Sequence, residues 1–504
     1  MNVVDERITE VQKKIIKLID DQLDYKIPLL LLLIRQVSIQ WKNEYDAAYS
    51  EAISDGLSPT EAEEEASKDT YHSVKIRKDR LWEDIHTDVE RMAQKLTESI
   101  KSLEDNNSNL QGIGKAINLT AYLADAKNVT KVSEAIEEIT DLPEDISSED
   151  LAKMFEYIII VYSLKSANKG GIYTPIEVID LLMRLLKPKP NETIYSPSSA
   201  YGEFLVRAFQ FIKINNPGEE SSIALYGEET KDEQYSMSKI NLALNRIDNI
   251  NMSYSNAIIH PGFKVSDTFQ KFDIIVTNPE WNQEGFDETA LKSGDFWRDR
   301  FPFGFTSKSK GDWAWIQHML ACANEDNGRV GIVIDTGALF RTDTTSEPVI
   351  RKEIVNRDWI DCVILLPEKL FYSNGGSAGA LIFFNKKKTQ DRKDKVMFVN
   401  ASELYNSDKR FGKKKNYLTE EAIDKVSRAY HDGFEEEGFS RLVEKQEIID
   451  WEYNLNVPLY VWKEEPPEDI KVKAEIIELD QIENELDKVR RRYGEIKALY
   501  GGDQ

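Results

Sequence analysis

The stretch FDIIVTNPEW, residues 272–281, joins a short β-branched run directly to a polar turn. An apolar run of this length that stops at Asn and Pro is typical of a buried strand with an abrupt end. Such a strand delivers an amide oxygen (Asn278), a carbonyl on a rigid turn (Pro279) and an aromatic face (Trp281) to one place. These groups can hold an extruded base by its amino group while stacking on it. Asn-Pro is also a common strand terminator, so spacing alone leaves the functional and the plain turn interpretations open.

Similar short runs alternate with helical stretches on both sides of this segment. They are ETIYS, SIALYG, SNAII, GRVGIVID, WIDCVILL and ALIFF, all between residues 192 and 384. The alternation predicts an α/β fold with a doubly wound, mainly parallel sheet and helices on both faces. Ligands of such sheets bind beyond the carboxyl ends of the strands, near the switch in strand order. The polar and aromatic segment from residue 282 to about residue 310 is longer than an ordinary connection, as functional loops often are.

Two further strand ends carry polar residues. After ETIYS, the chain must turn tightly if a cofactor is to approach the backbone, and Gly202 is there to permit it. SIALYG is followed by Glu228 and Glu229, and a carboxylate at this place can accept both hydroxyl protons of a ribose. A plain strand-to-helix turn and an ordinary acidic strand end are the alternatives.

Apolar residues spaced three and four apart predict an all-α amino-terminal domain over residues 1–168. Residues 169–455 are expected to form the α/β domain, and residues 456–504 a tail that ends in a long helix. The tail helix has an apolar seam that consists of Val472, Ile476, Leu479, Ile482, Leu486, Val489, Tyr493, Ile496 and Tyr500. The seam favours a coiled-coil-like pairing surface, although packing on the chain's own amino-terminal helices would use the same pattern.

The 504 residues include 65 Lys and Arg against 89 Asp and Glu, a net charge of −24. This balance argues against a protein that grips nucleic acid alone, unless a basic face is hidden in the average or a basic partner supplies the grip. Two lysine-rich stretches, KKKTQDRKDK (386–395) and KRFGKKK (409–415), are such hidden basic patches, with a solvated loop as the plain alternative for each.

Two cysteines are too few for a disulfide framework or a thiolate metal site, so we expect a reducing cytoplasm and no metal. The longest apolar run, residues 27–34, is far shorter than the roughly 20 residues of a membrane-spanning helix. The first ten residues also lack the basic region of a secretory signal. These features predict a cytoplasmic protein without a membrane segment.

Placed in order behind YTP (173–175), the three strand ends resemble those of the methylation subunit of type I restriction-modification systems, within the amino-group-specific DNA methyltransferases. The resemblance covers nearly the whole chain. It extends through KSKGDWAWIQHMLACANEDNGRVGIVIDTGALFR (308–341), IRKEIVNRDWIDCVILLPEKLFYSNGGSAGALIFFNK (350–386), VMFVNASELY (396–405) and YNLNVPLYV (453–461). It implies an S-adenosylmethionine-dependent methyltransferase sheet, and transfer of a methyl group from S-adenosylmethionine to the exocyclic amine of adenine in double-stranded DNA.

The resemblance also implies roles for individual residues. Those implied for the cofactor are Tyr173, Thr174 and Pro175 at its border, Ser196 and Gly202 in the turn after the first strand, and Glu229 on its ribose. Asn278 and the Pro279 carbonyl would hold the amine, and Trp281 would stack on the extruded adenine. Two hydrogen bonds accepted from the amine would aim its lone pair at the methyl group, so positioning and electrostatics would drive transfer without a strong base.

The implied partners are duplex DNA, a specificity subunit that recognises the sequence, and a restriction (nuclease) subunit as a further member of the complex. The carboxy-terminal helix would dock on the specificity subunit. Basic residues of that partner would supply much of the phosphate neutralisation that a chain of charge −24 lacks.

The chain departs from the family's motifs at several places. In the first motif, D-P-x-x-G-S-G-x-F, Ser196 replaces the aspartate, Ala200 the first glycine and Tyr201 the serine. In the fourth motif, N-P-P-aromatic, Glu280 replaces the second proline. Near the end of the third strand, where the family often has Gly-Asp, this chain has His-Pro-Gly (260–262). A catalytically impaired pseudo-methyltransferase that acts as a scaffold or DNA clamp is therefore the alternative. A nicotinamide-dependent oxidoreductase would share the sheet and the ribose carboxylate, but the chain has no G-x-G-x-x-G after the first strand.

Overall fold

The computed structural model describes residues 3–87, 91–165, 173–342, 346–371, 378–410, 413–463 and 472–500. The chain divides into two compact units, Met1–Val461 and Trp462–Gln504. The described helices include none with the combination of length and apolar character that crossing a bilayer requires.

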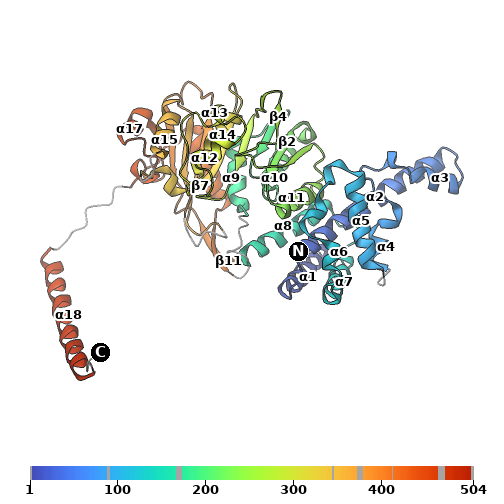
Figure 1. The fold of residues 1–504 in the computed structure, drawn as a ribbon, viewed down its shortest axis with the longest axis horizontal. Helices are drawn as coiled ribbons and strands as arrows, with labels where there is room; N and C mark the ends of the chain where they lie inside the picture. The colour runs from blue at the N-terminus through green and yellow to red at the C-terminus, as the bar shows by residue number, and fades with distance from the viewer. Residues whose placement is uncertain are drawn as a thin grey trace. The chain divides into compact units, whose positions relative to one another are not determined.

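The amino-terminal part of the first unit is helical (Figure 1). Its α-helices are α1 (Val3–Asp20), α2 (Lys26–Ser54), α3 (Pro59–Ala66), α4 (Trp82–Thr87), α5 (Met92–Asn106), α6 (Leu119–Tyr122), α7 (Ala126–Thr140) and α8 (Ser148–Lys165). Its short 3-10 helices are η1 (Asp69–Tyr71), η2 (Lys78–Arg80), η3 (Ser108–Leu110) and η4 (Ile113–Ala116). Local chemistry explains several ends: at the start of α3, Ser58 and Glu61 each accept a hydrogen bond from the other's backbone N–H.

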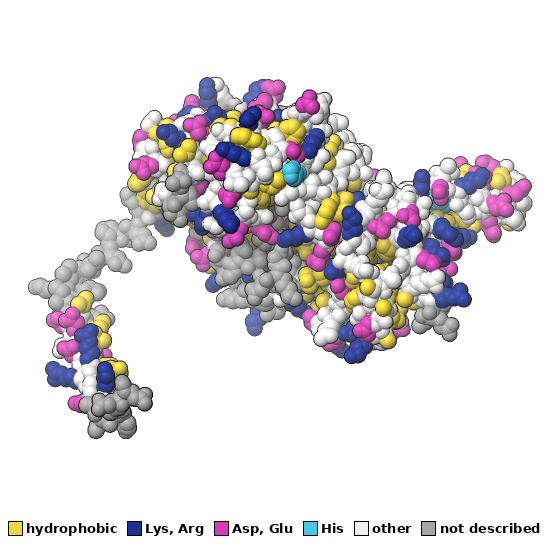
Figure 2. Space-filling model, in the orientation of Figure 1, with side chains coloured by type: hydrophobic (Ala, Val, Ile, Leu, Met, Phe, Trp, Pro, Cys, Tyr) yellow, Lys and Arg dark blue, Asp and Glu magenta, His cyan; other side chains and the backbone are white. Residues whose placement is uncertain are grey.

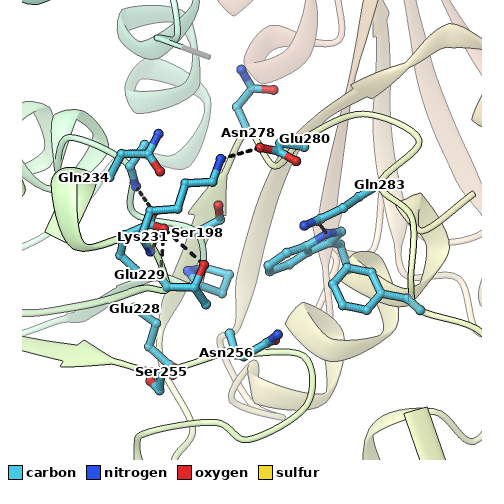
Figure 3. Close-up of a pocket in the computed structure, with 16 residues that line it drawn as sticks. Ser198, Glu228, Glu229, Lys231, Gln234, Ser255, Asn256, Asn278, Glu280 and Gln283 are labelled. Carbon is cyan, nitrogen blue, oxygen red and sulfur yellow. Dashed lines mark hydrogen bonds and ion pairs between the residues drawn. The ribbon is translucent and has the colours of Figure 1, made fainter. Parts of the chain in front are cut away.

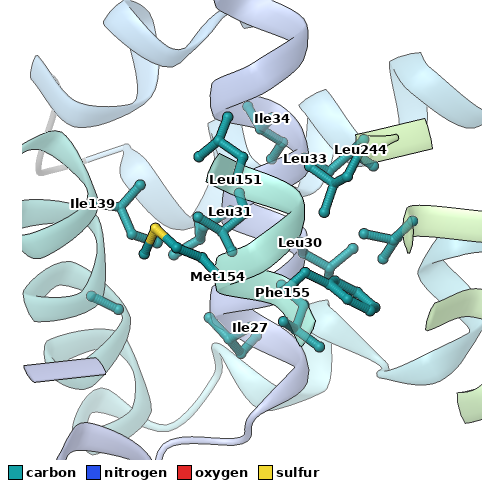
Figure 4. Packing of buried hydrophobic residues seen from close by; sticks show 14 of the residues in the cluster. Ile27, Leu30, Leu31, Leu33, Ile34, Ile139, Leu151, Met154, Phe155 and Leu244 are labelled. Carbon is teal, nitrogen blue, oxygen red and sulfur yellow. The ribbon is translucent and has the colours of Figure 1, made fainter. Parts of the chain in front are cut away.

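The apolar run in α2 lies at the centre of this helical part. A helix that is apolar on every side must be surrounded by other elements. Figure 4 shows this environment, with residues of α7 and α8 and with Leu244 of α11 around Leu30 and Leu31. The same hydrophobic cluster contains Tyr201, Met237 and Ile240, which belong to the α/β part of the chain. The helical part and the sheet part therefore share one core.

Nine strands form the central sheet. They are β1 (Thr193–Ser196), β2 (Ala224–Glu229), β3 (Ile250–Tyr254), β6 (Ile274–Thr277), β7 (Arg329–Asp335), β8 (Ile360–Leu365), β9 (Gly379–Asn385), β10 (Lys395–Asn400) and β13 (Ser440–Glu444), in the order β13-β10-β8-β9-β7-β6-β1-β2-β3. β9 is antiparallel to β7 and β8, and β13 is antiparallel to β10, whereas the other pairs are parallel. Two small hairpins, β4 (Lys264–Val265) with β5 (Thr268–Phe269) and β11 (Asn406–Arg410) with β12 (Lys413–Tyr417), stand apart from it.

Helices cover both faces of the sheet, as the sequence predicts. One face packs against α9 (Ile176–Leu186), α10 (Glu203–Asn215) and α16 (Glu420–Asp432). The other packs against α14 (Asp312–Cys322), α15 (Glu347–Asn356) and α17 (Lys445–Asp450). The remaining elements of this part are η5 (Glu220–Ser222), α11 (Asp232–Leu244), α12 (Glu288–Ser293), α13 (Trp297–Arg300), η6 (Thr336–Leu339) and η7 (Val457–Leu459). The predicted doubly wound sheet is thus confirmed.

One strand prediction needs correction. SNAII, residues 255–259, is a turn, and the strand lies just before it at Ile250–Tyr254. The apolar residues Ala257 and Ile258 are buried because the turn folds inward, whereas β3 is an edge strand of half-exposed residues with no apolar run. ALIFF forms a strand, as predicted, and this strand runs antiparallel to both neighbours in the mainly parallel sheet.

The second unit contains α18 (Val472–Tyr500). Its seam side chains for which exposure is described are Leu479, Ile482, Leu486, Val489, Tyr493 and Ile496, and they are 46–67% exposed. A helix with a row of exposed apolar side chains has a surface that can pair with another helix.

Candidate functional site

A pocket opens at the carboxyl ends of β1, β2 and β6 (Figure 3). Its empty volume is about 600 Å³, including the solvent at its mouth. Because β1 is flanked by β2 and β6, the pocket occupies the crevice at the switch in strand order. Its lining residues are Pro197, Ser198, Ala200, Glu228, Glu229, Thr230, Lys231, Gln234, Ser255, Asn256, Ala257, Asn278, Glu280, Gln283, Phe286 and Trp315.

Glu229, at the end of β2, presents its carboxylate to this pocket. Its Oε2 accepts the backbone N–H of Ala200 at 3.0 Å, and its Oε1 accepts those of Thr230 and Lys231 at 2.8 and 3.0 Å. Burial raises the pKa of Glu229, and these amide donors oppose the rise. A carboxylate oxygen can accept two hydrogen bonds, so Oε2 retains the capacity to accept a hydroxyl proton.

Glu228 is fully buried beside Glu229, and its carboxylate is bonded to neighbouring parts of the protein. It accepts hydrogen bonds from the hydroxyls of Tyr195 and Ser255, each at 2.7 Å, and from the backbone N–H of Gly262 at 3.0 Å. A Cβ at Gly262 would lie 2.0 Å from a side-chain oxygen of β3, so only glycine fits there. Glu228 therefore ties β1, β2 and the loop after β3 together as the floor of the pocket.

The turn after β1 keeps its shape despite its unusual residues. Ala200 has φ +46°, in the left-handed region that favours glycine, and Gly202 has φ +77°. The strain at Ala200 is on the order of 1 kcal/mol. Tyr201 is 1% exposed in the core shared with the helical part and does not line the pocket. The tyrosine therefore leaves the pocket open.

Ser196 ends β1, and Ser199 lies in the turn that follows it. Their hydroxyl oxygens are buried and have no hydrogen-bond partner among the described residues. A Cβ at Gly227 would come within 2.9 Å of the Ser199 hydroxyl. Unsatisfied buried hydroxyls are uncommon in proteins. The hydroxyls of Ser196 and Ser199 therefore leave two unpaired polar atoms next to the turn after β1.

Asn278 connects the pocket to the segment that begins at Tyr173. Its Nδ2 donates to Thr174 Oγ1 at 3.1 Å, and its Oδ1 accepts the indole N–H of Trp281 at 3.0 Å. Thr174 in turn donates to Glu203 Oε1 at 3.4 Å, and Tyr173 donates its hydroxyl proton to a glutamate of α8. These bonds hold the amide of Asn278 in one orientation.

Trp281 lies beside the pocket rather than in its lining. Its ring meets Phe371 at an angle of 70°, with the centroids 4.9 Å apart. It also lies against the backbone of Gly379, where an added Cβ would be 2.7 Å from Phe371 and 2.9 Å from the indole. The indole is therefore seated by a glycine on β9 and by its own bond to Asn278.

An ion pair crosses the mouth of the pocket. Lys231 Nζ lies 2.6 Å from Glu280 Oε1, and both side chains are close to half exposed (Figure 3). On the opposite wall, the rings of Phe286 and Trp315 meet edge to face, and the Trp315 indole donates to Gln283 at 3.0 Å. The pocket thus has one acidic wall and one aromatic wall.

Arg341 fixes the chain just after Trp281. Its guanidinium donates to Asn282 Oδ1 at 2.6 Å and to the carboxylates of Asp312, Asp335 and Glu347 at 2.8–3.1 Å. Asn282 has φ +54°, a left-handed conformation that these bonds stabilise. Burial raises the pKa of Asp312 and Glu347, and Arg341 opposes the rise.

The pocket brings together some of the predicted residues. Glu229 and Asn278 line it, and Thr174 and Trp281 contact Asn278. Thr174 and Trp281 lie outside its lining themselves, as do the other predicted residues Tyr173, Pro175, Ser196, Gly202 and Pro279. The aromatic wall formed by Phe286 and Trp315 was not predicted from the sequence. The sequence feature that could have indicated it is the long polar and aromatic segment after Trp281, which contains Phe286.

Comparisons with known proteins agree with this geometry. The family model described as N-6 DNA Methylase matches residues 146–469. The type I restriction enzyme MjaVII methylase subunit of Methanocaldococcus jannaschii is 32% identical over 94% of this chain and 80% of its own length, and the MjaVIII methylase subunit of the same organism is 32% identical over 96% and 83%. Among solved structures, the type I restriction-modification system methyltransferase subunit from Streptococcus thermophilus has a TM-score of 0.77 at 21% identity, covering 91% of this chain and 100% of that chain. This last likeness is one of fold.

Proposed function

This chain belongs to the N-6 DNA methylase family, among the methylation subunits of type I restriction-modification systems, and from that membership we propose that it methylates the exocyclic amine of adenine in duplex DNA. The proposed donor is S-adenosylmethionine. The observation that carries the proposal is that Glu229 and Asn278, from different strands, face one pocket at the switch point.

The residues present fit the proposed cofactor. The Glu229 carboxylate can accept ribose hydroxyl protons, and the unpartnered hydroxyls of Ser196 and Ser199 provide polar atoms next to the turn. Ala200 keeps the turn in the shape that glycine would take, so its substitution does not fill the pocket. Tyr173, Thr174, Pro175 and Gly202 are proposed to shape the rest of the cofactor site. When bound, S-adenosylmethionine supplies an electrophilic methyl group.

Asn278 and Pro279 are proposed to hold the target amine. The Oδ1 of Asn278 and the carbonyl of Pro279 would each accept one amine hydrogen, which aims the nitrogen lone pair at the methyl group. The bond from Asn278 Nδ2 to Thr174 supports this role, because it turns Oδ1 away from Thr174. Preorganised acceptors of this kind lower the barrier without a strong base.

Trp281 is proposed to stack on the extruded adenine. Its support is its position next to Asn278 and the contacts with Phe371 and Gly379 that seat the ring. Base–aromatic stacking is worth about 1 to 3 kcal/mol per base.

The exposed apolar seam of α18 is a surface that can pair with another helix, and we propose a specificity subunit as that partner. From the family membership we propose a restriction subunit as a further member of the complex. Deleting residues 472–504 should abolish assembly with the specificity subunit and leave cofactor binding by the first unit unchanged. Assembly that survives the deletion would contradict this role of α18.

Isothermal calorimetry with S-adenosylmethionine tests the cofactor site. Glu229→Ala should abolish measurable binding, whereas Glu219→Ala, an exposed control, should leave it unchanged. Methylation of adenine-containing duplex by the assembled complex tests the chemistry, and Asn278→Ala should abolish it without changing cofactor affinity. A wild-type chain that binds no cofactor and transfers no methyl group would instead support the scaffold or DNA clamp, which the loss of the motif's aspartate at Ser196 favours.

A further inference from the structure

The α18 helix carries its charges in two blocks. Its described side chains, residues 479–497, are all exposed. The first block, residues 479–487, has four acidic residues and no basic residue, whereas the second, residues 488–497, has five basic residues and one acidic residue. Figure 2 shows these charged side chains beside exposed hydrophobic ones on the helix. A helix with this polarity along its length fits a partner helix of the opposite polarity.

The two blocks include the positions that border the apolar seam. The seam repeats in heptads, and its a and d positions are Leu479, Ile482, Leu486, Val489, Tyr493 and Ile496. Positions e and g flank such a seam and contact the partner helix. The flanking positions are acidic in the first block, at Glu483 and Glu485. They are basic in the second block, at Arg490, Arg492 and Lys497.

The flanking charges match those of a second α18 that runs in the opposite direction. In an antiparallel pair, e positions face e positions and g positions face g positions. With the two seams centred on the boundary between the blocks, Glu483 faces Arg490 of the other copy. Glu485 then faces Arg492, and twofold symmetry repeats both contacts, so four flanking contacts all join opposite charges. Arg490 also lies 3.7 Å from Asp487 of its own helix, but it is 71% exposed and has donors left for a second carboxylate.

A parallel pair of the same helices is less favourable. In that arrangement, each g position faces the e position of the next heptad on the other helix. Glu485 would face Arg490, but Arg492 would face Lys497. Because flanking charges set the orientation of paired helices, the like charges in the second block favour the antiparallel pair.

We propose that α18 pairs antiparallel with the α18 helix of a second copy of this chain when no other helix covers its seam. The pair buries the apolar side chains of both seams, and the flanking ion pairs select the partner. Self-pairing uses the face proposed for the specificity subunit. It is therefore a state of the free chain, and assembly with that subunit must open the pair. The inference goes beyond the proposed function, since neither cofactor nor DNA takes part in it.

Sedimentation velocity of the full chain, without other subunits, tests the pairing. Over about 1 to 200 µM, which suits micromolar dissociation constants, the wild type should shift from the 57.9 kDa chain toward twice that mass. Glu483→Arg/Glu485→Arg makes the four paired positions basic, and Arg490→Glu/Arg492→Glu makes them acidic. An exposed ion pair changes an equilibrium about twofold, so turning four attractions into repulsions should weaken self-association on the order of a hundredfold in each variant. An equal mixture of the two variants should pair about as tightly as the wild type, because every flanking contact again joins opposite charges.

Asp480→Arg/Glu495→Arg is the matched control. It changes the net charge as much as the first variant does, but at exposed positions outside the flanks of the seam, and it should self-associate like the wild type. A wild type that stays monomeric over the whole range would overturn the proposal and leave the seam to a different helix. An equal loss in the control, or a mixture that does not recover, would also overturn it. A chain that pairs as expected but transfers no methyl group would refute the proposed function and retain the pairing.

Disulfide trapping tests the orientation. In the antiparallel pair, Ile482 of one copy lies in the same layer as Tyr493 of the other. A mixture of Ile482→Cys and Tyr493→Cys should therefore cross-link in oxidised glutathione, and neither variant alone should. The native Cys322 and Cys362 are buried and do not compete. Cross-linking of each variant with itself would show a parallel pair and overturn the assigned orientation.

Discussion

Replacing Glu203 with Gln removes a buried carboxyl group from the first turn of α10. The side chain is 4% exposed and accepts the backbone N–H of Tyr201 at 3.1 Å. Burial raises the pKa of Glu203 from 4.5 to about 7, and the charge of Glu229 adds to the rise. The substitution keeps the size of the side chain but removes its titration.

The size of the effect follows from proton linkage. A carboxyl group with a raised pKa holds its proton longer in the folded state than in the unfolded state. Its stabilising contribution is therefore complete below pH 4.5 and is lost as the pH rises through about 7. Each unit of pKa difference corresponds to about 1.4 kcal/mol, so the free energy of unfolding should fall by about 3 kcal/mol across this range because of Glu203.

Urea unfolding of the full chain at several values between pH 4.5 and 8 measures this loss. Other buried acids also titrate, so the informative quantity is the difference between the wild type and Glu203→Gln at each pH. That difference should change by about 3 kcal/mol, whereas the exposed control Glu219→Gln should follow the wild type. A difference that stays constant over the range would refute the reasoning, because the carboxyl group would then titrate alike in both states.

Three further substitutions test individual features. Arg341→Ala should lower the free energy of unfolding by about 3 to 5 kcal/mol in urea titrations, because it strands buried carboxylates; a loss below about 1 kcal/mol would contradict the role given to this network. Ala200→Gly should relieve the left-handed strain and raise cofactor affinity or stability, by up to about 1 kcal/mol, and a loss of both would show that the turn is not strained. Gly379→Ala should push the Trp281 ring away from Phe371 and cost about 1 to 3 kcal/mol of stability, measured by thermal denaturation, while unchanged stability would mean that the ring has room to move.

The sequence predicted the fold class well because the central strands are buried on both sides and appear as uninterrupted apolar runs. The direction of β9 was not predictable, because a buried strand shows the same apolar run whether its neighbours are parallel or antiparallel. β3 was displaced for the opposite reason: an edge strand needs no apolar run, and the buried turn that follows it has one.

In the site, the sequence located the residues that stand at strand ends. Glu229 and Asn278 could be predicted because the carboxyl ends of parallel strands converge at one edge of a sheet. The buried position of Tyr201 could not be predicted, because its ring packs against helices that come much earlier in the chain. The bonds of Arg341 to four other residues are also beyond sequence reasoning, since they join segments up to 59 residues apart.

The core that Tyr201, Met237 and Ile240 share with the amino-terminal helices has a consequence for chimaeric proteins. The sequence suggests a cut near residue 168, and a cofactor-binding fragment that starts there would carry Tyr201 on an uncovered face. Its apolar neighbours would meet water, and the turn at Ala200 would lose the packing that opposes its strain. A chimaera made by exchanging methyltransferase parts between relatives should therefore take the amino-terminal helices and the turn at Ala200 from the same parent protein.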